Sequence, residues 1–184
     1  MPPSDGRSSR SSAASGRAIR ILGIDPGSLI TGFGLIEALG QDARHIASGC
    51  IRAPAGELPQ RLRAIYAAVS ELMSSYAPAE VAIERVFVSR NADSALKLGQ
   101  ARGAALCATF GLDVSIHEYA PRTIKQAVVG HGGADKQQVQ HMVRVLLRLD
   151  RSPAADAADA LAVALCHAQL RRTAALIAQA RLRA

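Results

Sequence analysis

Residues 18–37, AIRILGIDPGSLITGFGLIE, place a carboxylate at the end of a strongly apolar segment. The isoleucines and the leucine before Asp25 have the pattern of a strand that is buried on at least one face. Residues 26–28, Pro-Gly-Ser, then turn the chain, and a second apolar segment follows at once, so the two segments predict a β-hairpin. A buried carboxylate is costly without a partner, so Asp25 either caps its own turn or belongs to a functional site at the sheet edge.

The order of the predicted elements indicates the fold class. Strands are expected over residues 19–24, 31–38, 44–52, 79–84 and 113–119. Helices are expected over residues 58–76, 91–111, 123–130, 136–149 and 154–170. Three strands in a meander, followed by strands that alternate with helices, predict an α/β fold with a mixed five-stranded sheet flanked by helices on both faces. The first and fourth strands should be parallel neighbours, which places Asp25 and Glu84 on one edge.

The last predicted helix carries Asp156 and Asp159, which are three residues apart and therefore face the same side of the helix. Two acids at a helix N-terminus can simply interact with the helix dipole, which is the structural alternative. Beside an edge that already carries Asp25 and Glu84, however, four carboxylates repel one another unless cations bind between them. Oxygen donors of this kind suit Mg²⁺ or Mn²⁺, and a pair of such ions can promote phosphodiester hydrolysis. The four acids together favour a metal site.

Positive charge is concentrated at the two ends of the chain. The formal net charge is +7, from 22 basic and 15 acidic residues. The head, residues 1–18, is rich in Ser, Gly and Arg, lacks the apolar region of a secretory signal, and is expected to be flexible. The tail, residues 171–184, contains arginines and no acids, and its last part, residues 175–184, is expected to have no fold. If the acids of the remaining domain, residues 19–170, surround metal ions, the rest of its surface is basic, as a phosphate-binding surface requires.

The cysteines and histidines give no sign of a zinc site. The three cysteines lie far apart in apolar segments, so we interpret them as free, buried thiols in a reducing compartment. These cysteines are Cys50, Cys107 and Cys166. Three histidines, His131, His141 and His167, lack the spacing of metal ligands and are interpreted as structural. Charges interrupt every apolar run before it approaches the length of a membrane span.

Four segments of the chain resemble the RuvC family of Holliday-junction resolvases, in the order in which that family has them. They are GIDPGSLITGFGLIE, IERVFVSRNADSALKLGQARG, RTIKQAVVGHGGADKQQVQHMV and ADAADALAVALCH, and they span about residues 19–170. The resemblance implies a ribonuclease-H-like fold, a homodimer and a requirement for divalent metal. It also implies a cytoplasmic enzyme of homologous recombination and DNA repair, with the RuvA–RuvB branch-migration complex as its partner. The head of the chain has no counterpart in the family.

The resemblance also implies roles for individual residues. The four catalytic and metal-binding acids of the family fall on Asp25, Glu84, Asp156 and Asp159, which would hold two Mg²⁺ or Mn²⁺ ions. The DNA-contacting residues fall on Phe87, Lys125 and Lys136, and Arg90 adds positive charge beside Phe87. From its position just after a strand, Phe87 could equally be a core residue. The implied reaction is paired phosphodiester hydrolysis near the crossover of a four-way DNA junction, leaving 5′-phosphate and 3′-hydroxyl ends.

Two other functions share parts of the pattern. GIDPGS followed by TGFGLI also resembles the first phosphate hairpin of actin-like ATPases and sugar kinases. Those proteins need a second glycine-rich phosphate loop and a second lobe, and this chain has no such loop and is too short for the lobe. A non-catalytic DNA-binding scaffold on the same fold is expected to have lost at least one acid, and all four are present.

A stripe of small residues is a candidate dimer surface. Ala95, Gly99 and Gly103 recur at every fourth position of the predicted helix 91–111. Glycine inside a helix is unfavourable by roughly 1 kcal/mol relative to alanine, so two glycines on one face suggest that another backbone approaches closely. The stripe either faces a second copy across a two-fold axis or packs on the sheet of its own chain.

Overall fold

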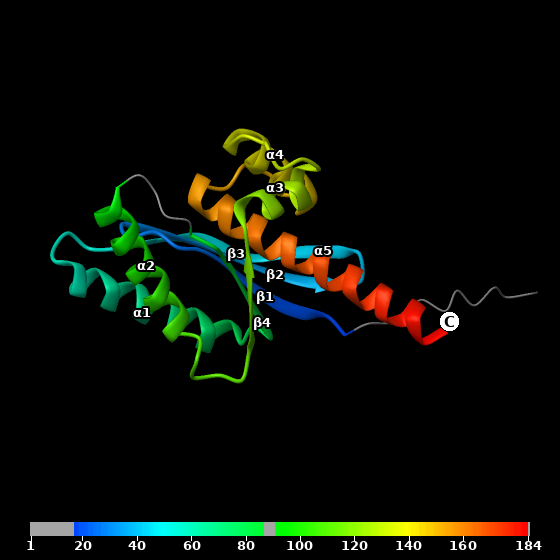
Figure 1. Ribbon diagram of the computed structural model, residues 1–184, viewed down its shortest axis with the longest axis horizontal. Coiled ribbons are helices and arrows are strands. Elements are labelled where there is room, and N and C mark those ends of the chain that lie inside the picture. The colour runs from blue at the N-terminus through cyan, green and yellow to red at the C-terminus, as the bar shows by residue number, and fades with distance from the viewer. Residues whose placement is uncertain (1–16, 87–90, 184) are drawn as a thin grey trace, which may run out of the picture.

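The computed structural model, which describes residues 17–86 and 91–183, is a five-stranded mixed sheet with helices on both faces (Figure 1). The strands are β1 (Ile19–Asp25), β2 (Ile30–Leu39), β3 (Asp42–Arg52), β4 (Glu80–Glu84) and β5 (Ser115–Tyr119). The helices are α1 (Leu58–Tyr76), α2 (Ala92–Cys107), α3 (Pro121–Val129), α4 (Lys136–Leu146) and α5 (Ala155–Arg183). The predicted fold class and order of elements are confirmed.

The strand order β3-β2-β1-β4-β5 places the first and fourth strands at the centre of the sheet. β1 and β2 form the predicted hairpin, and β3 continues it as an antiparallel meander. β4 runs parallel to β1, with Ile24 opposite Ile83, and β5 runs parallel to β4. The central strands β1 and β4 therefore end at the same edge of the sheet.

Helix α5 lies directly against the backbone of the β1–β2 hairpin. A Cβ atom added at Gly23 would stand 2.1 Å from the carbonyl oxygen of Ala160, and one added at Gly32 would stand 2.0 Å from that of Asp156. Only glycine therefore allows the helix to approach this closely. The alanine-rich start of α5 completes the contact, so the turns that carry the predicted acids are held against the hairpin.

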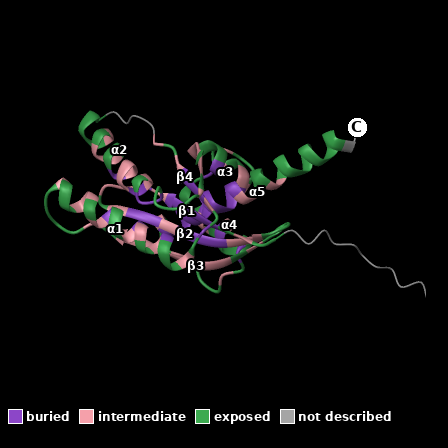
Figure 2. Ribbon diagram, turned by 90° about the horizontal axis from the view of Figure 1, so that it is seen from below, coloured by how far each residue is buried: buried purple, intermediate pink, exposed green. Residues whose placement is uncertain are grey.

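Two apolar cores fill the two faces of the sheet. One core packs α1 and α2 on the sheet, through side chains such as Ile65, Val69 and Ala101. The other packs α3, α4 and α5 on the opposite face, through side chains such as Ile124, Val143 and Leu161. Figure 1 shows α1 and α2 together on one side, and Figure 2 shows the buried residues gathered between the layers.

Two predicted helix starts have the expected capping interactions. The side chain of Asn91 accepts a hydrogen bond from the backbone N–H of Ser94, which begins α2. Asp135 and Gln138 form a reciprocal capping box at the start of α4. The cap therefore fixes where α4 begins, and with it the position of its first residue, Lys136.

Two expectations about the C-terminal part and the cysteines were wrong. Residues 175–184 were expected to have no fold, but α5 continues as a helix to Arg183. Arginine, alanine, leucine and glutamine are good helix formers, and this segment contains neither glycine nor proline. All three cysteines are free, but only Cys166 is buried, whereas Cys50 is half-buried and Cys107 is exposed at the end of α2.

None of the helices in the described part of the chain combines the length and hydrophobicity that a membrane span requires.

Candidate active site

Asp25 and Glu84 end the two central parallel strands and form a hydrogen-bonded pair. Burial, together with the hydrogen bond and the negative charge of Glu84, raises the pKa of Asp25 to about 8. Burial also raises the pKa of Glu84, and the nearby Asp159 carboxylate acts in the same direction. Two carboxyl groups this close hold one proton between them, and Asp25 is the one that retains it. The pair therefore needs added positive charge to be fully ionised.

The turn after β1 is closed by Thr31 and not by Asp25. The Thr31 hydroxyl donates to the carbonyl oxygen of Gly27 at 2.9 Å, and the N–H of Gly27 lies 3.3 Å from the same hydroxyl. Thr31 is fully buried. The alternative that Asp25 simply caps its own turn is therefore wrong, and the carboxylate points to the neighbouring acids.

The start of α5 brings Asp159 to the same edge of the sheet. Asp159 lines a cavity together with Asp25 and Glu84, and its charge raises the pKa of both. Asp156, one turn earlier, is half-buried and contributes negative charge at Lys136, but it does not line this cavity. The structure thus gathers three of the predicted acids closely and places the fourth beside them.

The two predicted lysines line the same cavity, which has a volume of about 270 Å³. Lys136 Nζ lies 3.3 Å from Asp159 Oδ2, and the charge of Asp159 raises the pKa of the lysine. The positive charges of Lys125 and Lys136 lower the pKa of Glu84 and oppose its desolvation. The remaining walls are formed by α3, α4 and α5. Its lining residues are Asp25, Glu84, Pro121, Ile124, Lys125, Lys136, Val139, Asp159 and Ala162.

The donor set of the cavity fits a hard divalent cation. It consists of carboxylate oxygens without sulfur or imidazole, which suits Mg²⁺ or Mn²⁺ better than Zn²⁺. The raised pKa values of Asp25 and Glu84 also favour a cation site, because a nearby positive charge stabilises the ionised form of such acids. Taken together, the carboxylate oxygens of Asp25, Glu84 and Asp159 are farther apart than the ligand atoms of an assembled metal site. In the described ranges, the only three candidate ligand atoms within 4.8 Å of one another belong to Glu80, His117 and His167.

That second cluster was missed by the sequence interpretation, which treated His167 only as a structural residue. Its members lie on three elements, β4, β5 and α5, and the only signal in the sequence is that Glu80 and His117 fall on adjacent predicted strands. A larger cavity of about 580 Å³ lies at the opposite end of the sheet, around the β2–β3 turn. It contains none of the predicted acids, so size alone does not locate the site.

Two of the predicted DNA-contacting residues, Phe87 and Arg90, lie outside the described residues. The adjacent Arg85 is described, and its Nε lies 3.5 Å from Glu118 Oε2. Its backbone N–H donates to the carbonyl oxygen of Tyr119, so Arg85 stays hydrogen-bonded to the end of β5.

Comparison with known proteins identifies the family. The family model of crossover junction endodeoxyribonuclease RuvC matches residues 21–167. A protein of that name from Alkalilimnicola ehrlichii is 62% identical over 148 residues, which is 80% of this chain and 90% of the relative. One from Vibrio campbellii is 58% identical over 153 residues, or 83% of this chain and 88% of the relative.

The structure of Thermus thermophilus RuvC in complex with a Holliday junction substrate superimposes with a TM-score of 0.79 at 36% identity. The superposition covers 85% of this chain and 96% of the Thermus chain. The yeast mitochondrial Holliday junction resolvase Ydc2 shares the fold, with a TM-score of 0.61 at 10% identity. The family match and the identities of the relatives show that this chain belongs to the RuvC family of crossover junction endodeoxyribonucleases.

Proposed function

We propose that this protein resolves four-way DNA junctions by metal-dependent phosphodiester hydrolysis at the cavity between β1, β4 and α5. The observation that carries the proposal is the convergence of Asp25, Glu84 and Asp159 from three elements, beside Lys125 and Lys136. Membership of the RuvC family supports the same activity, and the Thermus relative binds a Holliday junction substrate. The products would be nicks with 5′-phosphate and 3′-hydroxyl ends.

The acids would act as the ligands of divalent ions. Two Mg²⁺ or Mn²⁺ ions bound there would supply Lewis-acid activation of water and stabilise the leaving oxygen. Asp25, which is bonded to Glu84 and lines the cavity with Asp159, would be one of the ligands of these ions. Asp159 approaches from the helix, and Asp156 would complete the shell from one turn earlier.

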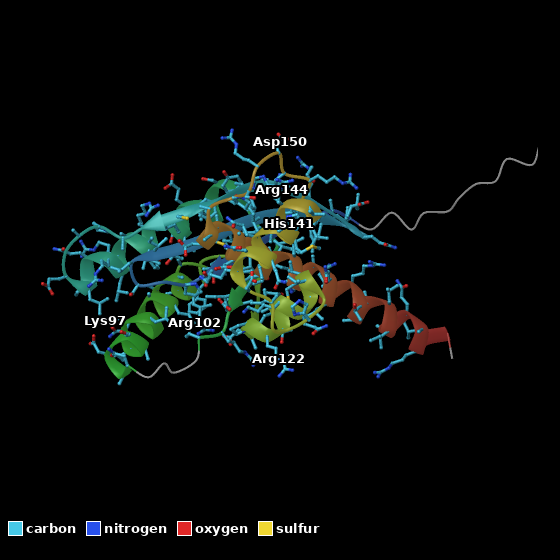
Figure 3. The ribbon with its side chains drawn as sticks, turned by 90° about the horizontal axis from the view of Figure 1, so that it is seen from above. Lys97, Arg102, Arg122, His141, Arg144 and Asp150 are labelled. Carbon is cyan, nitrogen blue, oxygen red and sulfur yellow. The ribbon has the colours of Figure 1, made fainter. Side chains whose placement is uncertain are left out.

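The lysines would position the phosphate. Lys125 on α3 and Lys136 on α4 stand on the cavity wall formed by the two short helices, where their charges are near the acids. An ammonium group at such a site attracts a phosphate oxygen and orients the backbone of the DNA. Arg122 on α3, which is exposed and labelled in Figure 3, would extend the basic surface along a DNA arm.

The alternatives have less support. A scaffold without activity has no need for two half-buried acids whose pKa values are raised by desolvation and by neighbouring carboxylates. An actin-like ATPase requires a second phosphate loop. The polar side chains of the cavity here are instead lysines and carboxylates, which come from strands and helices of one domain. Both alternatives predict no cleavage of junction DNA with Mg²⁺.

We further infer that the active form is a homodimer that uses the stripe of α2. A Cβ atom added at Gly99 or Gly103 would meet nothing within 4 Å, so the stripe does not pack on the sheet of its own chain. Leu96 is 63% exposed on the same helix, and Phe110 is 65% exposed just after it. Exposed apolar side chains beside small residues suit a helix–helix contact with a second copy. Association with RuvA–RuvB and a cytoplasmic location stay predictions.

The proposal is tested with Asp25→Asn and synthetic four-way junctions. The variant should lose cleavage in Mg²⁺, because a ligand is lost, while retaining or tightening junction binding in Ca²⁺, because a negative charge is removed beside the phosphate. Cleavage is measured on labelled junctions and binding by gel shift. Asp42→Asn, in the distant β2–β3 turn, is the matched control and should behave as wild type. Full activity of Asp25→Asn would remove the cavity from the reaction.

A further inference from the structure

A polar cluster at the other end of β4 ties α5 to the sheet. His167 on α5 is 2% exposed and lies between two partners. Its Nδ1 is 2.7 Å from the hydroxyl of Tyr119, and its Nε2 is 2.5 Å from Glu80 Oε2. The other oxygen of Glu80 accepts a hydrogen bond from Arg171 Nε at 2.8 Å. We call Glu80, Tyr119, His167 and Arg171 the His167 clamp.

A single protonation state satisfies every bond of the clamp. Burial alone would raise the pKa of Glu80, but the bonds to His167 and Arg171 lower it, so the carboxylate is ionised. Burial raises the pKa of Tyr119 to about 12, so its hydroxyl keeps its proton and donates. Burial lowers the pKa of His167, which is therefore neutral, with Nε2–H donating to Glu80 and Nδ1 accepting from Tyr119. The imidazole bridges the strands and the helix in one defined orientation.

The clamp and the acids are carried by the same two elements. Glu80 and Glu84 are the first and last residues of β4. Asp159 and His167 are eight residues apart on α5, or about 12 Å along the helix axis. Any sliding or rotation of α5 that separates His167 from Glu80 therefore also moves Asp159 relative to Glu84.

Apolar packing already resists such sliding, because Leu161, Val163 and Leu165 of α5 are buried in the core. Where α5 crosses the hairpin, it meets Gly23 and Gly32 with Ala160 and with its own backbone. These contacts, and the Leu161 side chain against Gly34, hold α5 near Asp159, and the directional hydrogen bonds of the clamp add a second constraint on the register farther along the helix. The neighbouring His117 stacks on His167 at 4.2 Å between ring centroids and limits rotation of the ring.

We propose that the His167 clamp is a positioning device, which sets the axial register of α5 on β4 and thereby places Asp159 opposite Glu84. The inference rests on the proposed catalytic role of these acids. Glu80, Tyr119 and His167 touch no reacting atoms and act through the helix.

A bound transition metal is the competing explanation, because atoms of Glu80, His117 and His167 lie within 4.8 Å of one another. The hydrogen bonds favour the clamp. Arg171 already neutralises Glu80, and Tyr119 and Glu80 already occupy both ring nitrogens of His167. The near-parallel stacking of the two imidazoles, 29° between planes, also suits packing better than ligation of one ion.

The test compares Glu80→Ala with Glu80→Gln and with Glu37→Ala. Glu37 is a matched control, because it also forms ion pairs with two arginines at this end of the sheet but, among the described side chains, has no bond to α5. The Mg²⁺ concentration for half-maximal junction cleavage is measured well below the melting temperature of each variant. Glu80→Ala should raise it by about 10-fold, whereas Glu37→Ala should not change it. Glu80→Gln keeps an acceptor for His167 and should restore most of the wild-type value.

Tyr119→Phe removes one bond of the clamp with little change in volume and should shift the Mg²⁺ requirement in the same direction, by less. An unchanged requirement in both Glu80→Ala and Tyr119→Phe would show that the cluster is only structural. If the wild type binds stoichiometric Zn²⁺ and His117→Ala does not, the cluster is a metal site and the proposed clamp is wrong. If Asp25→Asn is inactive while the Glu80 and Tyr119 variants leave the Mg²⁺ requirement unchanged, the clamp fails and the proposed active site stands. If Asp25→Asn is active, the proposed active site itself is wrong.

Discussion

The ammonium group of Lys136 lies 3.3 Å from Asp159 Oδ2, at the point where the first residue of α4 faces the second turn of α5. The capping box of Asp135 and Gln138 fixes the start of α4 and therefore the place of this lysine. The ion pair is only partly shielded, since the lysine side chain is 76% exposed, so its value for stability is small. Its significance is that an exposed cationic side chain lies beside an acid of the proposed site.

We expect Lys136→Gln to lower junction cleavage by about 10- to 100-fold, as loss of an outer partner of a metal ligand typically does. The loss should be accompanied by weaker junction binding, because a phosphate contact is also removed. Single-turnover cleavage and gel shifts in Ca²⁺ measure the two effects separately. Arg144→Gln, an exposed charge on the same helix, should change neither. Equal behaviour of the two variants would show that Lys136 is an ordinary surface lysine.

The stability of metal-free protein should fall as the pH rises. The pKa of Asp25 is raised from 3.8 to about 8, so the folded state favours the protonated acid. Its stabilising contribution is fully present below pH 3.8 and is lost as the pH rises towards 8. With EDTA, melting temperatures measured from pH 5 to pH 8.5 should therefore decline more in the wild type than in Asp25→Asn.

Addition of Mg²⁺ should reverse this decline, because a divalent cation favours the ionised acids. The increase in melting temperature on adding Mg²⁺ should be larger at pH 8 than at pH 6, and it should be reduced in Asp25→Asn. A Mg²⁺ effect that is equal at both pH values would show that the ion does not bind at Asp25 and Glu84.

Gly99→Leu should give a folded monomer. The position is open within the chain, so the leucine clashes only with a second copy that packs on the stripe. Analytical ultracentrifugation should report a monomer, and a cruciform plasmid should be nicked at most. Ala174→Leu, at an exposed position near the end of α5, is the control and should stay dimeric. A Gly99→Leu protein that is dimeric and linearises the plasmid would place the interface elsewhere.

Phe87→Ala should impair cleavage of intact junctions while leaving metal binding unchanged. A phenylalanine stacked on an unpaired base contributes on the order of 1–3 kcal/mol. The defect should shrink on a junction that is already unpaired at its centre, so the two substrates are compared in the same cleavage assay. An equal loss on both, with a lower melting temperature, would indicate a core residue.

Local patterns in the sequence were enough to predict the fold. The alternation and length of the apolar segments identified all five strands, and caps such as Asn91 and Asp135 located the starts of α2 and α4. Crossover rules then made β1 and β4 parallel neighbours, which brought Asp25 and Glu84 to one edge. The elements are encoded within short stretches of chain, and the crossover rule needs only their order, so both can be read without coordinates.

The relations between distant segments were decided only by the tertiary structure. From their spacing on the helix alone, Asp156 and Asp159 were expected to be equivalent. The approach of α5 to the glycines of the hairpin places Asp159 at the cavity and Asp156 beside it. The raised pKa of Asp25 and the His167 clamp also depend on burial and on distances between elements. Such quantities arise only when the layers pack together, because no local pattern specifies how far apart two side chains from different elements will lie.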